Sequence, residues 1–585
     1  MNWVRRIAAF AMAALSLAML GCSKGGEQQK ETLGLDIDVP ITEETLPAAG
    51  GEIKMYIPTN ADLTDPLSVN TEEMMNFFSL VYESLITINN DGKLNPELAE
   101  NWTSEDGGKT WTVNLRTGVT WHKVGRNFTA NDVTATFERL KTLGEDSYYY
   151  YAARDIESIE AIDNTTLKVV MKEGGYAFLY AMTFPVMMNG EPSAYPLGTG
   201  PYYYDGYSGE SLQLTANDGW WRQRPYIDKF IFIERDSNDT ALASYNAGQL
   251  DVVATSATTV GKYRQDGITN VQDVMTQNVE IMLVNSNSQS LNDVKVRQAL
   301  ACALDRSKII SNIYMNRAQA CDVPIAPDSW IYESKSKLYD YNTVKALELF
   351  AEAGWTDSDG DGRLEKNGMS LTEMSLKILV NDSTDSTRKN AAAAIAEQLE
   401  ELGIATEIVA APFSVASDKN EYTDKLAAGE YDIALVGINV GRDGDMRDVM
   451  ARDGKANYGN YYDAELYELA CAMMKAGDEA SYRSAASKFQ LAFAERLPFI
   501  PLYFRLDSIV CAAEIKGMTD VREPDIMRNV DKWYIYTTEK QKYHYWRDDG
   551  KEKRDGIRHS GGHCTYRRSA QQALGGDVAS DQWRV

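Results

Sequence analysis

Hydrophobic and polar residues follow a regular pattern between residues 373 and 438. Leu376, Ile378 and Val380 alternate with polar residues, and a following run of helix-forming residues ends at Gly403. The pattern predicts five elements in order: a strand over 373–382, a helix over 385–403, a strand over 404–411, a helix over 415–428 and a strand over 431–438. Strands that alternate with helices pair in parallel through right-handed crossovers, so we expect a parallel α/β sheet.

A second pattern occurs twice. Residues 243–254 and 424–435 both contain the end of a helix, Ala-Gly, two residues, Asp and then an apolar strand. Gly248 and Gly429 of the two copies lie 181 positions apart (429 − 248). This separation indicates two α/β lobes of related design. The space between two lobes is a common place for a small ligand to bind.

The character of the chain changes between about residues 60 and 192. Residues 102–121 alternate and contain turn signals, which is typical of antiparallel strands. Residues 129–144 then predict a helix with Asp132 near its start and Gly144 at its end. We therefore expect an α+β subdomain inserted in the first lobe.

The first 22 residues have the composition of a secretory signal. Two arginines precede an apolar run from Ile7 to Leu20, which is too short to span a bilayer and ends at Gly21-Cys22. This end resembles the bacterial lipobox, which implies cleavage before Cys22 and lipidation of its thiol. An ordinary signal peptide with a chance cysteine is the alternative. Residues 23–51 are polar and acidic, as expected of a flexible tether.

Charge and cysteine content exclude some classes of function. The 585-residue chain has a net charge of −26 and no basic stretch in its body, which argues against a nucleic-acid partner. Residues 541–585 differ from the body, with nine basic residues, six acidic residues and no periodicity, so we expect a disordered tail. Six cysteines allow one or two disulfides without fixing their pairing.

Three short motifs resemble known sites, but each has a simpler explanation. Gly198-Thr199-Gly200-Pro201 lacks the Lys-Ser/Thr of a phosphate loop, and its proline removes a backbone donor, so we expect a structural turn before three tyrosines. Residues 357–368 begin like an EF-hand but end at Gly368 instead of glutamate, which favours a turn-rich loop over a calcium site. His122 is the only histidine of the body, and we expect it to be packed at a strand end.

Several stretches together resemble the family 5 extracellular solute-binding proteins, the dipeptide and oligopeptide receptors of ABC importers. They are residues 63–86, 92–133, 197–207, 296–310, 353–368 and 495–504. The resemblance implies an α/β, two-lobed periplasmic-binding-protein-like fold of class II, with an extra α+β subdomain in the first lobe. The expected boundaries are 52–272 for lobe I (insertion at about 60–192), 273–489 for lobe II and 490–540 for a segment that returns to lobe I.

The resemblance also implies a function. It predicts a lipid-anchored extracytoplasmic receptor, monomeric and without enzymatic activity, metal or cofactor, which captures a peptide and delivers it to a membrane permease. Other ligands known in the family, namely nickel chelates, haem, glutathione and oligosaccharides, remain alternatives. A receptor that senses peptides without importing them is a further alternative. A secreted glycan hydrolase that uses two carboxylates is an alternative from another class.

Candidate ligand-binding residues follow the strand predicted at 431–438. Peptide-binding members hold the ligand's α-amino group with an aspartate near the position of Gly441, and Asp443 or Asp445 are the nearest carboxylates. Ile438 stands where the family usually has tryptophan. The remaining candidates are Asn439 at the strand end, Arg442 for a carboxylate, and Tyr149 and Tyr150 for stacking. The alternatives are solvent-facing acids and tyrosines that pack within the insertion.

Overall fold

The computed structural model describes residues 47–536 apart from 70, 191–194, 210, 367–371, 384–386 and 415–419. The described residues belong to one compact unit, Pro47–Val585. The predicted signal, the lipidation site Cys22, most of the tether and the predicted tail lie outside the described residues. Within the described ranges, no helix has both the length and the apolar character needed to cross a membrane.

The principal sheet has seven strands, and its order confirms the α/β pattern predicted between residues 373 and 438. Two neighbours, β17 and β18, pair in parallel, and β19 pairs in parallel with the other side of β17. The strands, in spatial order, are β11 (Val252–Thr255), β20 (Ile500–Ala512), β12 (Thr269–Val284), β19 (Ile433–Asn439), β17 (Ser375–Asp382) and β18 (Ala405–Pro412), with β13 (Ala318–Ala320) paired to β20. The connecting helices are α9 (Thr387–Glu400) and α10 (Glu421–Ala428).

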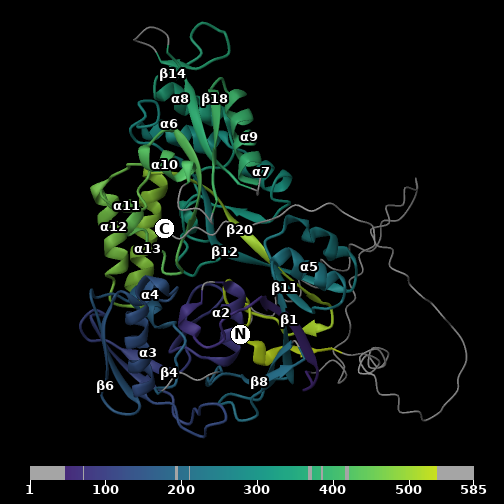
Figure 1. Ribbon diagram of the computed structural model, residues 1–585. Coiled ribbons are helices and arrows are strands. Elements are labelled where there is room, and N and C mark those ends of the chain that lie inside the picture. The colour runs from purple at the N-terminus through teal and green to yellow at the C-terminus, as the bar shows by residue number, and fades with distance from the viewer. Residues whose placement is uncertain are drawn as a thin grey trace, which may run out of the picture. The chain divides into compact units, whose positions relative to one another are not determined.

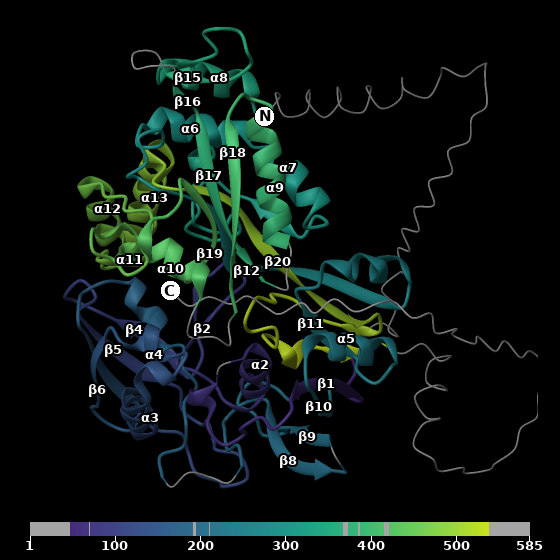
Figure 2. The same cartoon turned by 45° about the horizontal axis from the view of Figure 1, so that its top comes forward.

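Two long antiparallel strands, β12 and β20, extend from one lobe into the other (Figures 1 and 2). The first half of β12 pairs with the second half of β20, beside β11. The second half of β12 pairs with the first half of β20 and with β19. The pairing is irregular between Met275 and Val279, where the strands pass from lobe I to lobe II.

The repeated Ala-Gly motif has the predicted local structure in both copies. Gly248 (φ 72°) separates α5 (Asn238–Asn246) from β11, and Gly429 (φ 68°) separates α10 from β19. These positive φ angles favour glycine, because a Cβ atom is strained there. The two strands that follow lie in the same sheet, on opposite sides of the β12–β20 pair. The two lobes are therefore joined through a shared sheet.

Lobe I also contains a four-stranded sheet in which β1 and β10 are parallel. The strands, in spatial order, are β1 (Glu52–Pro58), β10 (Lys229–Arg235), β9 (Ser211–Ala216) and β8 (Tyr202–Ser208). Helix α2 (Glu72–Val81) packs in the same core, which also contains Trp533 from the returning segment. The chain therefore completes lobe I with residues from near its C-terminal end.

The predicted α+β insertion is confirmed as a four-stranded antiparallel sheet with one long helix. The strands, in spatial order, are β4 (Ala99–Thr103), β5 (Thr110–Leu115), β7 (Thr166–Met171) and β6 (Ile156–Ala161). Helix α3 (Ala130–Leu143) begins at a capping box in which Thr129 N–H donates to Asp132 Oδ2 over 2.8 Å. Gly144 ends the helix, as predicted.

The remaining elements mainly surround lobe II and the junction with the insertion. The helices are α4 (Tyr150–Ala153), α6 (Val294–Ala303), α7 (Arg306–Asn312), α8 (Thr343–Glu352), α11 (Arg447–Met450), α12 (Ala464–Met474) and α13 (Glu479–Arg496). The short strands are β2 (Ile86–Ile88), β3 (Leu94–Pro96), β14 (Trp355–Thr356), β15 (Glu365–Lys366), β16 (Thr372–Glu373), β21 (Ile515–Lys516) and β22 (Tyr534–Ile535). The four described cysteines, at 302, 321, 471 and 511, are unpaired, so none of them forms a disulfide.

Candidate functional site

A cleft of about 1140 Å³ is lined by both lobes and by the insertion. This volume is slightly above the range of about 300–1,000 Å³ that is typical of pockets for small ligands. The wall contributed by lobe II is the loop that follows β19, and Gln277 at the irregular point of β12 adds to it. The opposite walls come from α2, from the insertion and from residues 522–531 of the returning segment. The cleft is therefore placed where the lobes meet.

Five of the six predicted ligand-binding residues line this cleft: Asn439, Arg442, Asp443, Asp445 and Tyr149. The sixth, Tyr150, is not among the lining residues, and its half-buried side chain packs against the apolar core that contains the insertion. Ile438, in the place of the family's tryptophan, also lines the cleft.

Asp445 is neutralised by a neighbouring arginine. Arg447 donates from Nε to Asp445 Oδ1 over 3.0 Å and from Nη2 to Oδ2 over 2.7 Å. The same guanidinium lies 3.6 Å from Glu173 and 4.0 Å from Asp155, both on the insertion. Asp445 therefore orients an arginine that connects lobe II to the insertion.

Asp443 has a different environment, although it is only two residues away. Its Oδ1 accepts a hydrogen bond from the backbone N–H of Asp445 over 3.2 Å, and Tyr482 donates its hydroxyl to the Asp443 carbonyl. Within the described part of the chain, Asp443 forms no salt bridge. Burial, together with the charge of Asp445, raises the pKa of Asp443 to about 7. A cationic ligand group would supply the partner that this carboxylate lacks.

Arg442 connects three segments at the base of the cleft. Its Nη2 donates to the carbonyl of Met275 on β12 over 3.4 Å and to that of Glu523 over 3.2 Å. Its buried Nε has no hydrogen-bond partner among the described residues. Backbone carbonyls, rather than carboxylates, are therefore the groups that position this guanidinium. Its positive charge acts to lower the pKa values of Asp328 and Glu523, but it forms no salt bridge with either within the described residues.

The aromatic run contributes to the cleft through Tyr148 and Tyr149. Their rings meet edge to face, with centroids 5.4 Å apart. Burial raises the pKa of the Tyr149 hydroxyl, so this group remains neutral. Tyr180 and Phe178 of the short helix η4 (Ala177–Met182) extend the aromatic lining. The insertion therefore supplies apolar surface on which side chains of a ligand can pack.

A second group of residues lines the far wall of the cleft and was not predicted from the sequence. Glu83 accepts hydrogen bonds from Trp220 Nε1 over 3.1 Å and from Trp221 Nε1 over 2.8 Å. Arg116 lies 4.1 Å from the centroid of the Trp221 ring, a cation–π contact. Burial and the nearby Glu97 raise the pKa of Glu83. The paired tryptophans were the available signal, but their partners lie more than 100 positions away.

The Gly-Thr-Gly-Pro turn supports this wall and is the structural corner that was predicted. A Cβ atom on Gly198 would lie 1.8 Å from the carbonyl oxygen of Val81, so the turn packs directly on the end of α2. Thr199 donates its hydroxyl to Glu83 over 2.7 Å. His122 Nε2 lies 2.9 Å from the Gly200 carbonyl, and burial lowers its pKa to about 4. His122 is the packed histidine that was expected.

The predicted turn-rich loop after α8 is also observed. Asp357 accepts hydrogen bonds from the backbone N–H groups of Gly360 and Gly362 over 2.7 and 3.1 Å. Carboxylate oxygens of Asp357, Asp359, Asp361 and Glu365 lie within 4.8 Å of one another, so the calcium alternative stays open. This loop is remote in sequence from the cleft-lining segments.

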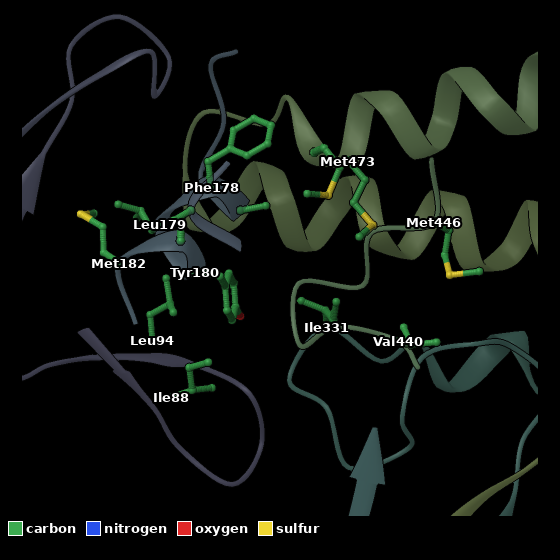
Figure 3. Close-up of a cluster of buried hydrophobic side chains, with 14 of the residues drawn as sticks. Ile88, Leu94, Phe178, Leu179, Tyr180, Met182, Ile331, Val440, Met446 and Met473 are labelled. Carbon is green, nitrogen blue, oxygen red and sulfur yellow. The ribbon is translucent and has the colours of Figure 1, made fainter. Parts of the chain in front are cut away.

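Buried apolar side chains join the insertion to lobe II beside the cleft. Figure 3 shows Phe178, Leu179 and Tyr180 of η4 on one side, and Met473 of α12 with Met446 and Ile331 on the other. These residues belong to one continuous cluster. Burial of such side chains contributes about 1.5–3 kcal/mol each to the contact. The cluster therefore stabilises the arrangement in which the insertion and the β19 loop both line the cleft.

Two α/β lobes joined by crossing strands, with a ligand-sized cleft and an inserted subdomain, define a periplasmic-binding-protein-like fold. The family model described as "Bacterial extracellular solute-binding proteins, family 5 Middle" matches residues 93–460. The chain belongs to this family. Members of the family are substrate-binding proteins of transporters rather than enzymes.

Individual relatives agree with this assignment. The oligopeptide-binding protein AppA of Bacillus subtilis (strain 168) is 26% identical over 511 residues, which cover 81% of this chain and 88% of AppA. The nickel-binding periplasmic protein of Escherichia coli (strain K12) is 26% identical over 384 residues, covering 62% and 71%. The crystal structure of a nickel ABC transporter protein from Bacillus halodurans matches with a TM-score of 0.71 at 21% identity, covering 82% of this chain and 98% of that one. The structure of AppA from B. subtilis with a nonapeptide matches with a TM-score of 0.58 at 22% identity, covering 84% and 100%.

Proposed function

We propose that the protein is the substrate-binding component of an ABC importer, which captures peptides between its lobes and delivers them to a membrane permease. The observation that carries this proposal is that two neighbouring residues in the cleft offer opposite charges: the carboxylate of Asp443, which forms no salt bridge within the described residues, and the guanidinium of Arg442. A peptide carries both complementary charges. The similarity to an oligopeptide-binding protein supports the same ligand class.

The two carboxylates of the β19 loop have different roles in this proposal. Asp443 accepts the ligand's ammonium group, because a desolvated ammonium requires a charged partner. Asp445 acts indirectly, by holding Arg447 toward the insertion. Arg442 interacts with a ligand carboxylate or carbonyl, and Asn439 adds an amide at the strand end.

Less specific contacts accommodate the rest of the peptide. Tyr149 offers a ring to ligand side chains, whereas Tyr150 supports the insertion from its core. Ligand that touches both lobes stabilises the closed arrangement, and the irregular pairing near Met275 is where the strands can bend. The free energy of closure then comes from contacts that exist only when the ligand bridges the lobes.

The proposed location is the outer face of the cell membrane, where a lipid on Cys22 anchors the protein. The protein is proposed to be a monomer. The apolar run followed by Gly-Cys supports this location. Replacement of Cys22 by serine should prevent lipidation and release the protein from the membrane fraction. Retention of the C22S variant in that fraction would contradict the anchor.

Native mass spectrometry of the protein purified from its own host tests the ligand. We expect unfolding to release short peptides, and Asp443→Ala to lose them. Asp445→Ala should keep peptides with reduced occupancy, because its carboxylate does not contact the ligand in this proposal. Release of a single sugar, metal chelate or haem instead would contradict peptide capture while leaving the assignment of the fold intact.

A further inference from the structure

Three acidic side chains from distant parts of the sequence converge beside the cleft. Glu72 is the first residue of α2, Asp507 lies on the crossing strand β20, and Glu523 lies in the returning segment. One carboxylate oxygen from each lies within 4.8 Å of the other two. None of the three lines the cleft as the described residues define it. The group, here called the hinge carboxylates, is therefore distinct from the ligand site.

The innermost member of the hinge carboxylates is buried and incompletely satisfied. Glu523 is only 7% exposed, and its Oε2 has no hydrogen-bond partner among the described residues. Burial and the nearby Glu72 and Asp507 raise the pKa of Glu523, and burial raises that of Asp507. Like charges in a site of low polarity repel one another strongly. A proton in the hydrogen bond between Glu72 and Glu523, or a bound cation, would relieve this repulsion.

Neighbouring arginines offset part of this negative charge without direct contact. Arg442 acts to lower the pKa of Glu523, and Arg505 and Arg317 act to lower that of Asp507. Arg442 donates to the backbone carbonyl of Glu523 rather than to its carboxylate. Arg317, near Asp507, donates to backbone carbonyls, including those of Thr255 and Leu506 over 3.0 Å each. Arg505, also near Asp507, is not seen to form a salt bridge within the described ranges. Nor do Asp507 and Glu523 form one there.

The geometry points to a calcium site formed by Glu72, Asp507 and Glu523. Calcium binds carboxylate oxygens at about 2.3–2.6 Å, so ligands on opposite sides of one ion lie up to about 5 Å apart. This distance covers the separations among the hinge carboxylates. Magnesium usually keeps several waters and binds only one or two protein carboxylates, so calcium is the better match to three carboxylates. Water and backbone carbonyls would complete the coordination.

The consequence of such a site is a link between three segments that meet at the junction of the lobes. A bound ion holds the start of α2, the crossing strand β20 and the returning segment together. It also fixes Glu523, whose carbonyl accepts a hydrogen bond from Arg442 in the cleft. The ion is therefore expected to stabilise the fold whichever solute the cleft binds.

Calcium binding by the full-length protein tests this site. The exposed loop with Asp357, Asp359, Asp361 and Glu365 is a second acidic group, so its contribution is removed first with Asp359→Asn and Asp361→Asn. In this background, equilibrium dialysis with radioactive calcium should find one bound ion. The melting temperature of the calcium-loaded protein should be higher than that of the EDTA-treated protein. Glu523→Gln should raise the Kd at least tenfold and remove the temperature shift.

A matched control is available on the same helix. Glu73 accepts a hydrogen bond from Tyr56 over 2.6 Å and does not belong to the hinge carboxylates, so Glu73→Gln should leave calcium binding unchanged. If Glu523→Gln does not fold, Asp507→Asn provides the same comparison. Absence of bound calcium in the loop-disabled background would overturn the proposal in favour of a shared proton. Calcium binding that survives both Glu523→Gln and Asp507→Asn would overturn it as well.

Discussion

Ligand affinity is expected to fall as the pH is lowered through about 7. Burial and the adjacent Asp445 raise the pKa of Asp443 to about 7, and Asp443 must be ionised to pair with a ligand ammonium. Below this pKa the free protein carries a proton that the ligand must displace. The affinity is therefore greatest above pH 7 and is lost on the acid side. Bound ligand should in turn lower the pKa of Asp443.

The size of the effect follows from competition with one proton. Protonation of Asp443 multiplies the apparent Kd by 1 + 10^(pKa − pH), a factor that rises about tenfold between pH 8 and pH 6 and about ninetyfold between pH 8 and pH 5. The loss of binding free energy cannot exceed the contribution of a hydrogen bond to a charged group. This contribution is about 1.5–3 kcal/mol, which corresponds to about a 10- to 150-fold change in Kd. The peptide's own amino group has a pKa of about 7.7–8.0, so deprotonation of the ligand weakens binding about two- to threefold at pH 8 and reduces the net loss between pH 8 and pH 6 to about three- to fivefold. Below pH 7 the amino group is protonated, so the ligand does not cause the loss there.

Isothermal titration calorimetry between pH 5 and pH 8, with the peptide released from the native protein, measures this dependence. Asp443→Asn should bind weakly at pH 8 and show little change with pH. Asp445→Asn should move the midpoint to lower pH, because it removes a negative neighbour and frees Arg447. A wild-type affinity that is constant from pH 8 to pH 5.5 would refute the assignment of Asp443 as the ammonium partner.

Two further predictions concern the framework that holds the site. Arg388 pairs with the buried Glu280 through two hydrogen bonds of 2.8 and 2.9 Å. Arg388→Leu should therefore lower the free energy of unfolding by about 3–5 kcal/mol in guanidinium titrations, and a second Glu280→Leu change should recover most of the loss. Gly198→Ala would place a methyl group 1.8 Å from the Val81 carbonyl, whereas a methyl on Gly261 meets no atom within 4 Å. Differential scanning calorimetry should show a melting temperature several degrees lower for Gly198→Ala and an unchanged one for the control variant Gly261→Ala. Equal melting temperatures for the two variants would contradict the close packing of the turn.

The parallel α/β segment could be predicted from the sequence because each of its elements has its own period and its own end signal. Leu376, Ile378 and Val380 alternate within β17, and Gly403 follows α9. The crossing strand β12 gives no such signal. Its burial changes along its 16 residues, from mostly exposed or half-buried in lobe I to fully buried in lobe II. A strand that serves two lobes has no single period to recognise.

The candidate site could be predicted only in part for a similar reason. The loop after β19 was found because its acids and Arg442 are adjacent in sequence. The difference between Asp443 and Asp445 depends on which of them Arg447 contacts, and spacing alone does not decide this. The far wall was missed because Glu83 and Trp221 are 138 positions apart. Contacts over such distances follow from topology rather than from local pattern.

The returning segment also determines when the first lobe can be completed during synthesis. β11 has β20 as its hydrogen-bonded neighbour in the sheet, and the fully buried Trp533 lies in the core that contains α2. A growing chain that has reached only residue 499 therefore has most of lobe I but lacks both β20 and this tryptophan. Its apolar strand edge remains uncovered until about 90% of the 585 residues have been made. Lobe II lacks β20 as well, so neither lobe can finish folding before the other is nearly complete.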